Sequence, residues 1–420
     1  MKLCQSIILC CLCLLGYGQS DTITWTQLSP LPDGVQHLGS AYFIIDSNFY
    51  VAGGQEGGGN NSINSVWRYH IPSDTWFRMN NLSWGSSICA ASFVLGGKGY
   101  FLTSRDSVNS GDCDTLFWEY NPQMDSWIKK ANFPDNPRQA SSYFNFNNIG
   151  YVAQTAGCNA EDSHLWKYDP AINKWTQLNS LPNSILVGGS TAVIGLSSSA
   201  YLFGGFDIGN NFSQDIWEYN IILNQWTNAG VIPGLNRSYS IFWQFDSVII
   251  GGGGEVSDNN SILNLGSDFY SYNIYTNSWT PVIFKNSFDS TAAGATFVYN
   301  QKAYYFGGFR SLVPFSFSNR MWSFDASKYI HDTSVGIREV SGEPAFSVYP
   351  NPASHSSAFS ISSSESGDVI FYDALGRMID ERRLIQGTNA IRLATSEEVI
   401  FYRATLRSGT SENGRIVFIR

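Results

Sequence analysis

The stretch Trp67-Arg-Tyr-His-Ile-Pro-Ser-Asp-Thr-Trp76 decides the fold, because the spacing of its aromatic residues returns four more times along the chain. The pattern is Trp or Tyr, any residue, Tyr, six further residues and Trp. The five copies are Trp67/Tyr69/Trp76, Trp118/Tyr120/Trp127, Trp166/Tyr168/Trp175, Trp217/Tyr219/Trp226 and Tyr270/Tyr272/Trp279. Their closing tryptophans follow one another at steps of 51, 48, 51 and 53 residues. A fixed period near 50 residues predicts a repeat architecture.

A short apolar segment precedes each copy and another follows the fifth copy, and four of these six segments end in glycines. They are Phe49-Tyr-Val-Ala-Gly-Gly54, Ala200-Tyr-Leu-Phe-Gly-Gly205, Val248-Ile-Ile-Gly-Gly252 and Ala303-Tyr-Tyr-Phe-Gly-Gly308. The segments before the second and third copies, Gly99 to Thr103 and Gly150 to Gln154, lack the double glycine. Trp and Tyr two residues apart leave the same face of a strand, and the closing Trp lies across a turn on the next strand. One such unit cannot bury its aromatic face alone, so neighbouring units must stack.

The double glycine, the Trp-x-Tyr and the closing Trp resemble the kelch repeat, in which each repeat is one four-stranded blade of a β-propeller. A sixth element, Trp322-Ser-Phe324, has no closing Trp after it, whereas Trp25 stands alone 51 residues before Trp76. We therefore expect the strand around Trp25 to complete the sixth blade and leave no free sheet edge. The predicted fold class is all-β: a six-bladed kelch-type β-propeller closed by an N-terminal strand, followed by a small C-terminal β-sandwich.

Composition and charge agree with many short strands joined by glycine turns. The 420 residues are 15% aromatic and 14% charged and include 39 glycines, which excludes disorder, coiled coil and collagen. The formal net charge is −9, and the chain lacks the basic stripe that binding to nucleic-acid phosphates requires. Nucleic acid is therefore excluded as a partner. There is no P-loop, HExxH or GxSxG motif and the five histidines are scattered, so neither a cofactor nor a metal is expected.

The two ends of the chain resemble targeting signals. Residues 1–18 have the basic start, apolar run and small residues of a secretory signal peptide. Residues 19–330 are assigned to the propeller, 331–344 to a linker and 345–420 to the C-terminal β-sandwich. The mature chain holds no further apolar run long enough to span a bilayer.

The C-terminal segment resembles the type A sorting domain of the type IX secretion system of Gram-negative bacteria. The resemblance rests on Tyr349-Pro-Asn-Pro-Ala353, on Asp373-Ala-Leu-Gly-Arg377 and on a basic C-terminus. It implies export through the periplasm, by the outer-membrane type IX machinery, to the cell surface or the medium. The alternative is a structural β-sandwich with no targeting role.

Three cysteines remain once the signal peptide is removed. On the propeller expectation, Cys113 and Cys158 occupy corresponding loops of adjacent blades and are the candidate disulfide. Cys89 lies in the apolar segment Ile88 to Phe93 and is expected to be a buried, inert thiol.

Ligand-binding residues are sought at the mouth of the channel, where the loops of a propeller converge. One position before each innermost strand recurs at steps of 50, 51, 50, 49 and 54 residues; it holds His37, Ser87, Arg138, Gly188, Arg237 and Thr291. The kelch resemblance implies that arginines here face the ligand, so that His37, Arg138 and Arg237 would receive a carboxylate or an acidic sugar. The alternative is that these arginines only satisfy carbonyls of adjacent loops.

The loops after the second strands are expected on the same rim, with Phe212, Phe315 and Phe317 available to stack on a ligand. Ordinary solvated turns are the alternative reading of the same residues. The loops are Gln55–Asn64, Asp106–Asp114, Glu161–Ser163, Asp207–Gln214, Glu255–Asn264 and Arg310–Asn319.

Three functions remain open at this stage. The first is an exported, surface-displayed module that binds a protein or a glycan. The second is an enzyme, because the six blades are similar to those of bacterial sialic-acid mutarotase, with Arg138, Arg237 and Glu255 as candidate acid/base residues. The third is a structural component of the cell surface.

Overall fold

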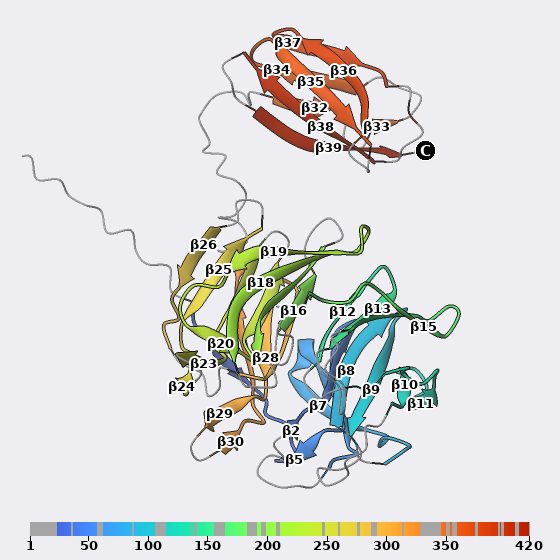
Figure 1. Ribbon diagram of the computed structural model, residues 1–420, viewed down its shortest axis with the longest axis vertical. Helices are drawn as coiled ribbons and strands as arrows, with labels where there is room; N and C mark the ends of the chain where they lie inside the picture. The colour runs from blue at the N-terminus through green and yellow to red at the C-terminus, as the bar shows by residue number, and fades with distance from the viewer. Residues whose placement is uncertain are drawn as a thin grey trace, which may run out of the picture. The chain divides into compact units, whose positions relative to one another are not determined.

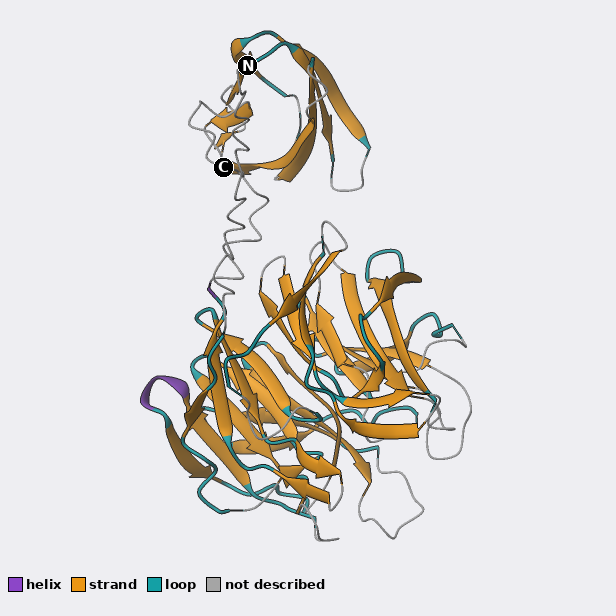
Figure 2. Cartoon of the chain, turned by 90° about the vertical axis from the view of Figure 1, so that its left-hand side faces the viewer, coloured by secondary structure: helices purple, strands orange, loops and turns teal. Residues whose placement is uncertain are grey.

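The chain forms two compact units, Met1–Val335 and Gly336–Arg420. The computed structural model describes residues 23–34, 37–56, 62–85, 88–105, 115–135, 137, 141–154, 164–182, 191–194, 199–206, 211–245, 248–258, 261–274, 278–286, 292–312, 315–327, 346–349, 353–354, 359–373, 377–393, 395, 399–407 and 411–419. The regular secondary structure of both units is almost entirely β-strand (Figure 2). The predicted signal peptide and linker lie outside the described residues.

Six sets of four antiparallel strands build the first unit, and Figure 1 shows successive sets beside one another in chain order. We number them as the first to the sixth sheet. The first holds β3 (Ala41–Ile45), β4 (Asn48–Ala52), β6 (Val66–His70) and β7 (Thr75–Met79); the second β8 (Ile88–Leu95), β9 (Lys98–Arg105), β10 (Phe117–Asn121) and β11 (Ser126–Lys129); the third β12 (Ser142–Phe146), β13 (Ile149–Gln154), β14 (His164–Asp169) and β15 (Lys174–Gln177). The fourth holds β16 (Thr191–Ile194), β17 (Ser199–Phe206), β18 (Phe212–Asn220) and β19 (Gln225–Val231); the fifth β21 (Ile241–Phe245), β22 (Val248–Gly252), β25 (Phe269–Asn273) and β26 (Ser278–Val282); the sixth β27 (Ala295–Tyr299), β28 (Lys302–Phe306), β31 (Met321–Asp325) and β1 (Thr26–Leu28).

The repeated aromatic residues lie where the spacing predicts. In the first five sheets, the Tyr of each copy is opposite the closing Trp of the neighbouring strand, as in the pair Tyr69 and Trp76. The remaining first-position tryptophans, Trp118, Trp166, Trp217 and Trp322, lie in the third strands of their sheets with Trp67, and Trp127, Trp175, Trp226 and Trp279 lie in the fourth.

The first strand of the chain completes the sixth sheet. β1 pairs with β31, with Thr26 opposite Ser323. Trp25, just before β1, is 3% exposed, and its ring centroid lies 4.6 Å from that of Phe324. Asn286, which follows the fifth sheet, accepts from the backbone N–H of Trp25 at 2.8 Å and donates to its carbonyl at 3.0 Å. The N-terminal segment thus joins the fifth and sixth sheets as well as completing the latter.

Hydrophobic clusters join each sheet to the next, and one of them joins the sixth to the first. In that cluster Phe49 stacks on Phe297 with ring centroids 4.5 Å apart. Between the second and third sheets, Phe117 meets Tyr168 edge to face at 4.7 Å. Because every neighbouring pair shares buried apolar side chains, the ring of sheets has one continuous aromatic core.

A polar contact repeats beside the aromatic one, and the sequence analysis did not identify it. In four sheets the Tyr of the third strand donates to an Asp or Asn five residues later, which also accepts a backbone N–H from the segment after the preceding sheet. The pairs are Tyr69–Asp74, Tyr120–Asp125, Tyr168–Asn173 and Tyr219–Asn224, at 2.7 to 2.8 Å, and the backbone donors are Ser29, Asn80, Ala131 and Asn179. Each acceptor has the left-handed backbone that Asp and Asn tolerate best among residues with a side chain. These residues tie each turn to the neighbouring sheet.

Glycines permit two kinds of close approach. Gly204, in the double glycine of the fourth sheet, has φ +64°, and a Cβ there would lie 2.5 Å from the carbonyl oxygen of Arg237. Gly99, in the second sheet, would carry a Cβ 2.5 Å from the ring of Phe43 in the first sheet. The second sheet lacks a double glycine but uses its single glycine to seat an aromatic ring of its neighbour.

The second unit has two sheets around one hydrophobic core. The three-stranded sheet holds β32 (Phe346–Tyr349), β34 (Phe359–Ser363) and β37 (Gly387–Ile391), and the five-stranded sheet holds β33 (Ala353–Ser354), β39 (Ser411–Ile419), β38 (Val399–Leu406), β35 (Gly367–Tyr372) and β36 (Met378–Leu384). Phe359 and Ile361 from one sheet pack with Val369 and Phe371 from the other. Asp373 accepts from the backbone N–H of Arg377 at 2.9 Å and from its Nε at 2.6 Å, so the Asp and Arg of Asp373-Ala-Leu-Gly-Arg377 bridge the connection from β35 to β36.

Candidate functional site

The two rims of the ring differ in how the chain turns. On one rim the first and second strands of a sheet meet in two-residue turns, and at Asn147 and Asn148 both turn residues have positive φ. On the other rim the chain leaves the second strand and forms small extra sheets (Figure 1). Two of them are separate sheets: β2 (His37–Leu38) with β5 (Gln55–Glu56), and β29 (Phe309–Leu312) with β30 (Phe315–Phe317). The third, β20 (Asn236–Ser238) with β23 (Glu255–Asp258) and β24 (Ser261–Leu265), continues the fourth sheet, because Arg237 of β20 pairs with Ser213 of β18. We call this side the hairpin rim.

Two segments expected as loops are therefore largely strands. Glu255–Asn264 falls mainly in β23 and β24, and Arg310–Asn319 falls mainly in β29 and β30. Their Gly, Asn, Ser and Asp content favours turns, but pairing with β20 and within each hairpin outweighs that local preference. The hairpin rim is consequently built on backbone pairing.

The side chain of Arg237 is enclosed by the fold and bonded within it. Its side chain is 0% exposed and donates to the carbonyl oxygens of Pro233, Leu235 and Gly253 at 3.1 to 3.3 Å. Its Nη2 also lies 2.7 Å from Oδ2 of Asp268. These contacts match the alternative in which the arginine satisfies nearby carbonyls, and they fix the segment before the fifth sheet against its second and third strands.

Glu255 is buried in β23, and no described residue plays the part that Asp268 and the carbonyls play for Arg237. It is 9% exposed, and burial raises the pKa of its carboxyl above the ordinary value. No hydrogen bond or ion pair to this carboxyl occurs in the part of the chain that the structure describes. Ser238 lies directly opposite Glu255 on β20, and its buried Oγ likewise has no hydrogen-bond partner among the described residues. Native proteins rarely leave buried polar groups unsatisfied, so this pair requires an explanation.

An apolar and aromatic cluster begins at the residue opposite Glu255 on the other side from Ser238. Leu265, opposite Glu255 on β24, packs with Tyr239 against the buried cluster of Phe309 and Phe317. Tyr239 has φ +51°, a conformation that costs energy for a bulky side chain. Its ring lies 5.6 Å from that of Phe206 and 6.1 Å from that of Phe309, measured between centroids.

Phe212 corrects a second expectation. It is 6% exposed and lies beside Phe206 with ring centroids 6.2 Å apart, so its ring is not available at the surface. The cause is that β18 begins at Phe212 and carries it into the fourth sheet. Phe317 is buried in the same way in the cluster with Phe309.

The other predicted site residues are only partly located. His37 pairs with Glu56 between β2 and β5, and Phe315 pairs with Leu312 between β29 and β30; both lie on the hairpin rim. The residues outside the described ranges are Ser87, Arg138, Gly188, Thr291, Cys113 and Cys158. Cys89 is a free, buried thiol in β8, and burial raises its pKa, as expected of an inert thiol.

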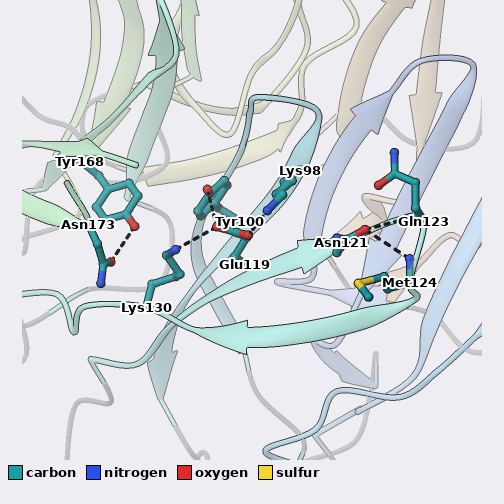
Figure 3. Close-up of polar contacts among 9 residues, drawn as sticks. All are labelled: Lys98, Tyr100, Glu119, Asn121, Gln123, Met124, Lys130, Tyr168 and Asn173. Atoms are coloured by element: carbon teal, nitrogen blue, oxygen red, sulfur yellow. Dashed lines mark hydrogen bonds and ion pairs between the residues drawn. The ribbon is translucent and has the colours of Figure 1, made fainter. Parts of the chain in front are cut away.

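A charged cluster inside the second sheet escaped the sequence analysis. The carboxylate of Glu119, 5% exposed, accepts from Lys98 at 2.6 Å and from the hydroxyl of Tyr100 at 2.8 Å, and Lys130 lies 3.1 Å from it (Figure 3). Burial alone would raise the pKa of Glu119, but these three partners outweigh it and lower the pKa below the ordinary value. One sequence feature could have revealed this cluster: Glu119 is an acidic residue between Trp118 and Tyr120 of the repeat.

The described residues contain neither a cluster of metal-ligating side chains nor a helix that could span a membrane. No three His, Cys, Asp or Glu side chains come together there as a metal site would require. Among those same residues, no helix has both the length and the apolar character needed to cross a membrane.

Comparisons with known proteins agree with the repeat. The Kelch motif model matches residues 39–83. Kelch-like protein 38 of Homo sapiens is 27% identical over 165 residues, which are 38% of this chain and 26% of that protein. Kelch-like protein 21 of Bos taurus is 25% identical over 291 residues, 59% of this chain and 46% of that protein. The chain thus spans from about a quarter to about half of the curated relatives it matches.

A solved structure gives the same result for the fold alone. The structure described as that of YjhT aligns with a TM-score of 0.58 at 14% identity, covering 70% of this chain and 95% of that one. The repeat, the partial matches to kelch-like proteins and the fold agree in one respect: the chain carries a Kelch motif at residues 39–83 and is similar to kelch β-propellers.

Proposed function

We propose that the chain is a six-bladed kelch propeller that acts as a protein-binding module and presents its ligand surface on the hairpin rim. The observation that carries this proposal is the difference between the two rims. One rim closes with minimal turns, whereas the other projects paired strands that hold a buried, unpartnered carboxylate at Glu255. Binding residues commonly lie on segments that a rigid scaffold positions, and backbone pairing makes these segments rigid.

A random peptide library displayed on phage tests the proposal against the full chain. We expect selected peptides to lose binding when residues 311–316 of the β29–β30 hairpin are replaced by Asn-Gly. The matched control is Gly96→Asn in a turn of the opposite rim, where Asn tolerates the φ of +55°. Peptides that bind the shortened variant as well as the wild type would contradict the proposal.

The alternative functions give different results. Binding to a glycan array without peptide binding would favour a glycan-binding module, and faster anomeric exchange of sialic acid in NMR spectra would favour a mutarotase-like enzyme. The buried Glu255, with its raised pKa, is consistent with an enzyme. Arg237 is not, because its side chain is already bonded to Asp268 and to backbone carbonyls. Binding to neither class of probe would leave the structural surface component.

Export and surface display are a separate proposal. We propose that residues 345–420 form a β-sandwich sorting domain of the type IX system and that residues 1–18 are a signal peptide. Support comes from the compact second unit and from the Asp373–Arg377 contact within the sorting-like motif. In a Gram-negative host with this system, fractionation should find the full chain at the surface or in the medium, and a chain lacking 345–420 in the periplasm. Surface display of the truncated chain would overturn it.

A further inference from the structure

Among the described residues, no Arg, Lys or His side chain pairs with the carboxyl of Glu255. Arg237, on the neighbouring strand β20, pairs with Val256 rather than Glu255, so its side chain lies on the opposite face of the small sheet and its guanidinium is bonded to Asp268. A buried carboxyl with no partner destabilises the ligand-free fold. Each such group in a native protein requires an explanation, and compensation by a bound ion is one of them.

The surroundings of Glu255 match a cation with an apolar stem. Directly opposite residues of an antiparallel pair share a face, so Ser238 and Leu265 flank the carboxyl on that face. Leu265 packs with Tyr239 on the Phe309 cluster, so the residue opposite the acid belongs to an apolar and aromatic cluster. Aromatic rings attract cations through their faces, and long basic side chains bury their methylene stems on apolar surface.

The charge of the whole chain points the same way. A formal net charge of −9 attracts basic partners and repels acidic ones. A sugar hydroxyl would also donate to the carboxyl, but it would leave the negative charge uncompensated. A cation therefore fits the site better than a neutral polyol.

We propose that Glu255 receives an arginine or lysine side chain of the bound protein, held between its carboxylate and the aromatic surface around Tyr239. The inference rests on the proposed protein-binding function and names the chemistry of its ligand. The basic group donates to the carboxylate, and its stem lies along Leu265 and Tyr239.

Short peptides binding to the full chain test the inference. The probe is Ac-Gly-Ser-Arg-Ser-Gly-NH2, compared with the same peptide carrying citrulline, which is neutral and nearly the same shape, and with a methyl glycoside. We expect the arginine peptide alone to bind in calorimetry, and Glu255→Gln to weaken it at least tenfold. Without ligand, Glu255→Gln should raise the melting temperature, because it removes an uncompensated buried charge.

Glu119→Gln is the matched control. It also removes a buried carboxylate from the ring, but one that already has partners, so it should lower the melting temperature and leave peptide binding unchanged. Equal binding of arginine and citrulline peptides, equal binding by wild type and Glu255→Gln, no binding of the arginine peptide up to its solubility limit, or binding of the glycoside alone would each overturn the inference. If library peptides without basic residues bind the hairpin rim and still bind Glu255→Gln, the protein-binding function stands and only this inference fails.

Discussion

The second sheet and the hairpin rim each bury a glutamate, and the surroundings shift the pKa of the two carboxyls in opposite directions. Glu119 is surrounded by Lys98, Lys130 and Tyr100, and its pKa is lowered. Glu255 has an unsatisfied serine and an apolar residue opposite it, and its pKa is raised. Burial is common to both, so the difference lies in the partners: a compensated carboxylate belongs to the scaffold, and an uncompensated one is available to a ligand.

The largest expected effect comes from a change that weakens the whole ring without touching either glutamate. Trp25→Ala removes the aromatic contacts that hold the first strand between the fifth and sixth sheets. We expect a loss of about 3–5 kcal/mol in the free energy of unfolding, the usual figure for truncating a buried Trp. Chemical denaturation of the full chain measures it. An unchanged midpoint would show that the ring does not depend on this closure.

Removing the partnered glutamate should have a smaller effect. Glu119→Ala leaves the Tyr100 hydroxyl and two lysines without their common acceptor, and we expect a loss of about 1–3 kcal/mol in stability. Denaturation curves of the variant and of Lys98→Met, which removes only the more exposed lysine, measure the contribution of the cluster. A stable Glu119→Ala variant would remove the contrast between the two glutamates.

A substitution next to the cluster separates packing from charge. Gly99→Ala places a Cβ against the ring of Phe43 but leaves every charge near Glu119 in place. We expect a loss of about 1–2 kcal/mol from overpacking, independent of pH. Restoration of stability by Phe43→Leu in the double variant would assign the loss to this contact, and no restoration would contradict it.

The smallest and most specific effect is the pH dependence, which has opposite sign at the two sites. The lowered folded-state pKa of Glu119 stabilises the fold above the unfolded-state value of about 4.3, and this contribution is lost as pH falls through the folded-state pKa. The raised pKa of Glu255 has no effect below about 4.3 and destabilises the fold as pH rises from there through the folded-state pKa.

Chemical denaturation of Glu119→Gln and Glu255→Gln between pH 3 and 7 measures these two contributions to stability. With rising pH, Glu119→Gln should become less stable relative to wild type, and Glu255→Gln more stable. The same sign in both variants would show that the two carboxyls have equivalent surroundings.

The sequence predicted the repeated parts of the fold because their spacing reflects a single strand geometry. The Trp-x-Tyr and closing Trp located the third and fourth strands, and the position of Trp25 predicted the strand that pairs with β31. The Asp or Asn five residues after each Tyr has an equally regular spacing and could have been found the same way.

The candidate site was less predictable because its residues do not repeat. Polar composition favoured loops at 255–264, although pairing with β20 makes strands there. Arg237 and Glu255 were both candidates, but only the fold shows that one is satisfied by carbonyls and Asp268 and the other by nothing in the described chain. The hydrogen-bond and ion-pair partners of a buried side chain depend on tertiary contacts, and the local sequence does not predict them.

The pairing of β1 with β31 also sets the order of assembly. The two strands are separated by almost three hundred residues, so the sixth sheet cannot be completed until nearly the whole first unit has left the ribosome. Earlier sheets form from residues close in sequence, whereas this last seam requires a long-range encounter, which is slow. Until β31 is synthesised, the earlier sheets form an open array with an unpaired strand edge. The pairing of β1 with β31, which closes the ring, is therefore a late step of folding.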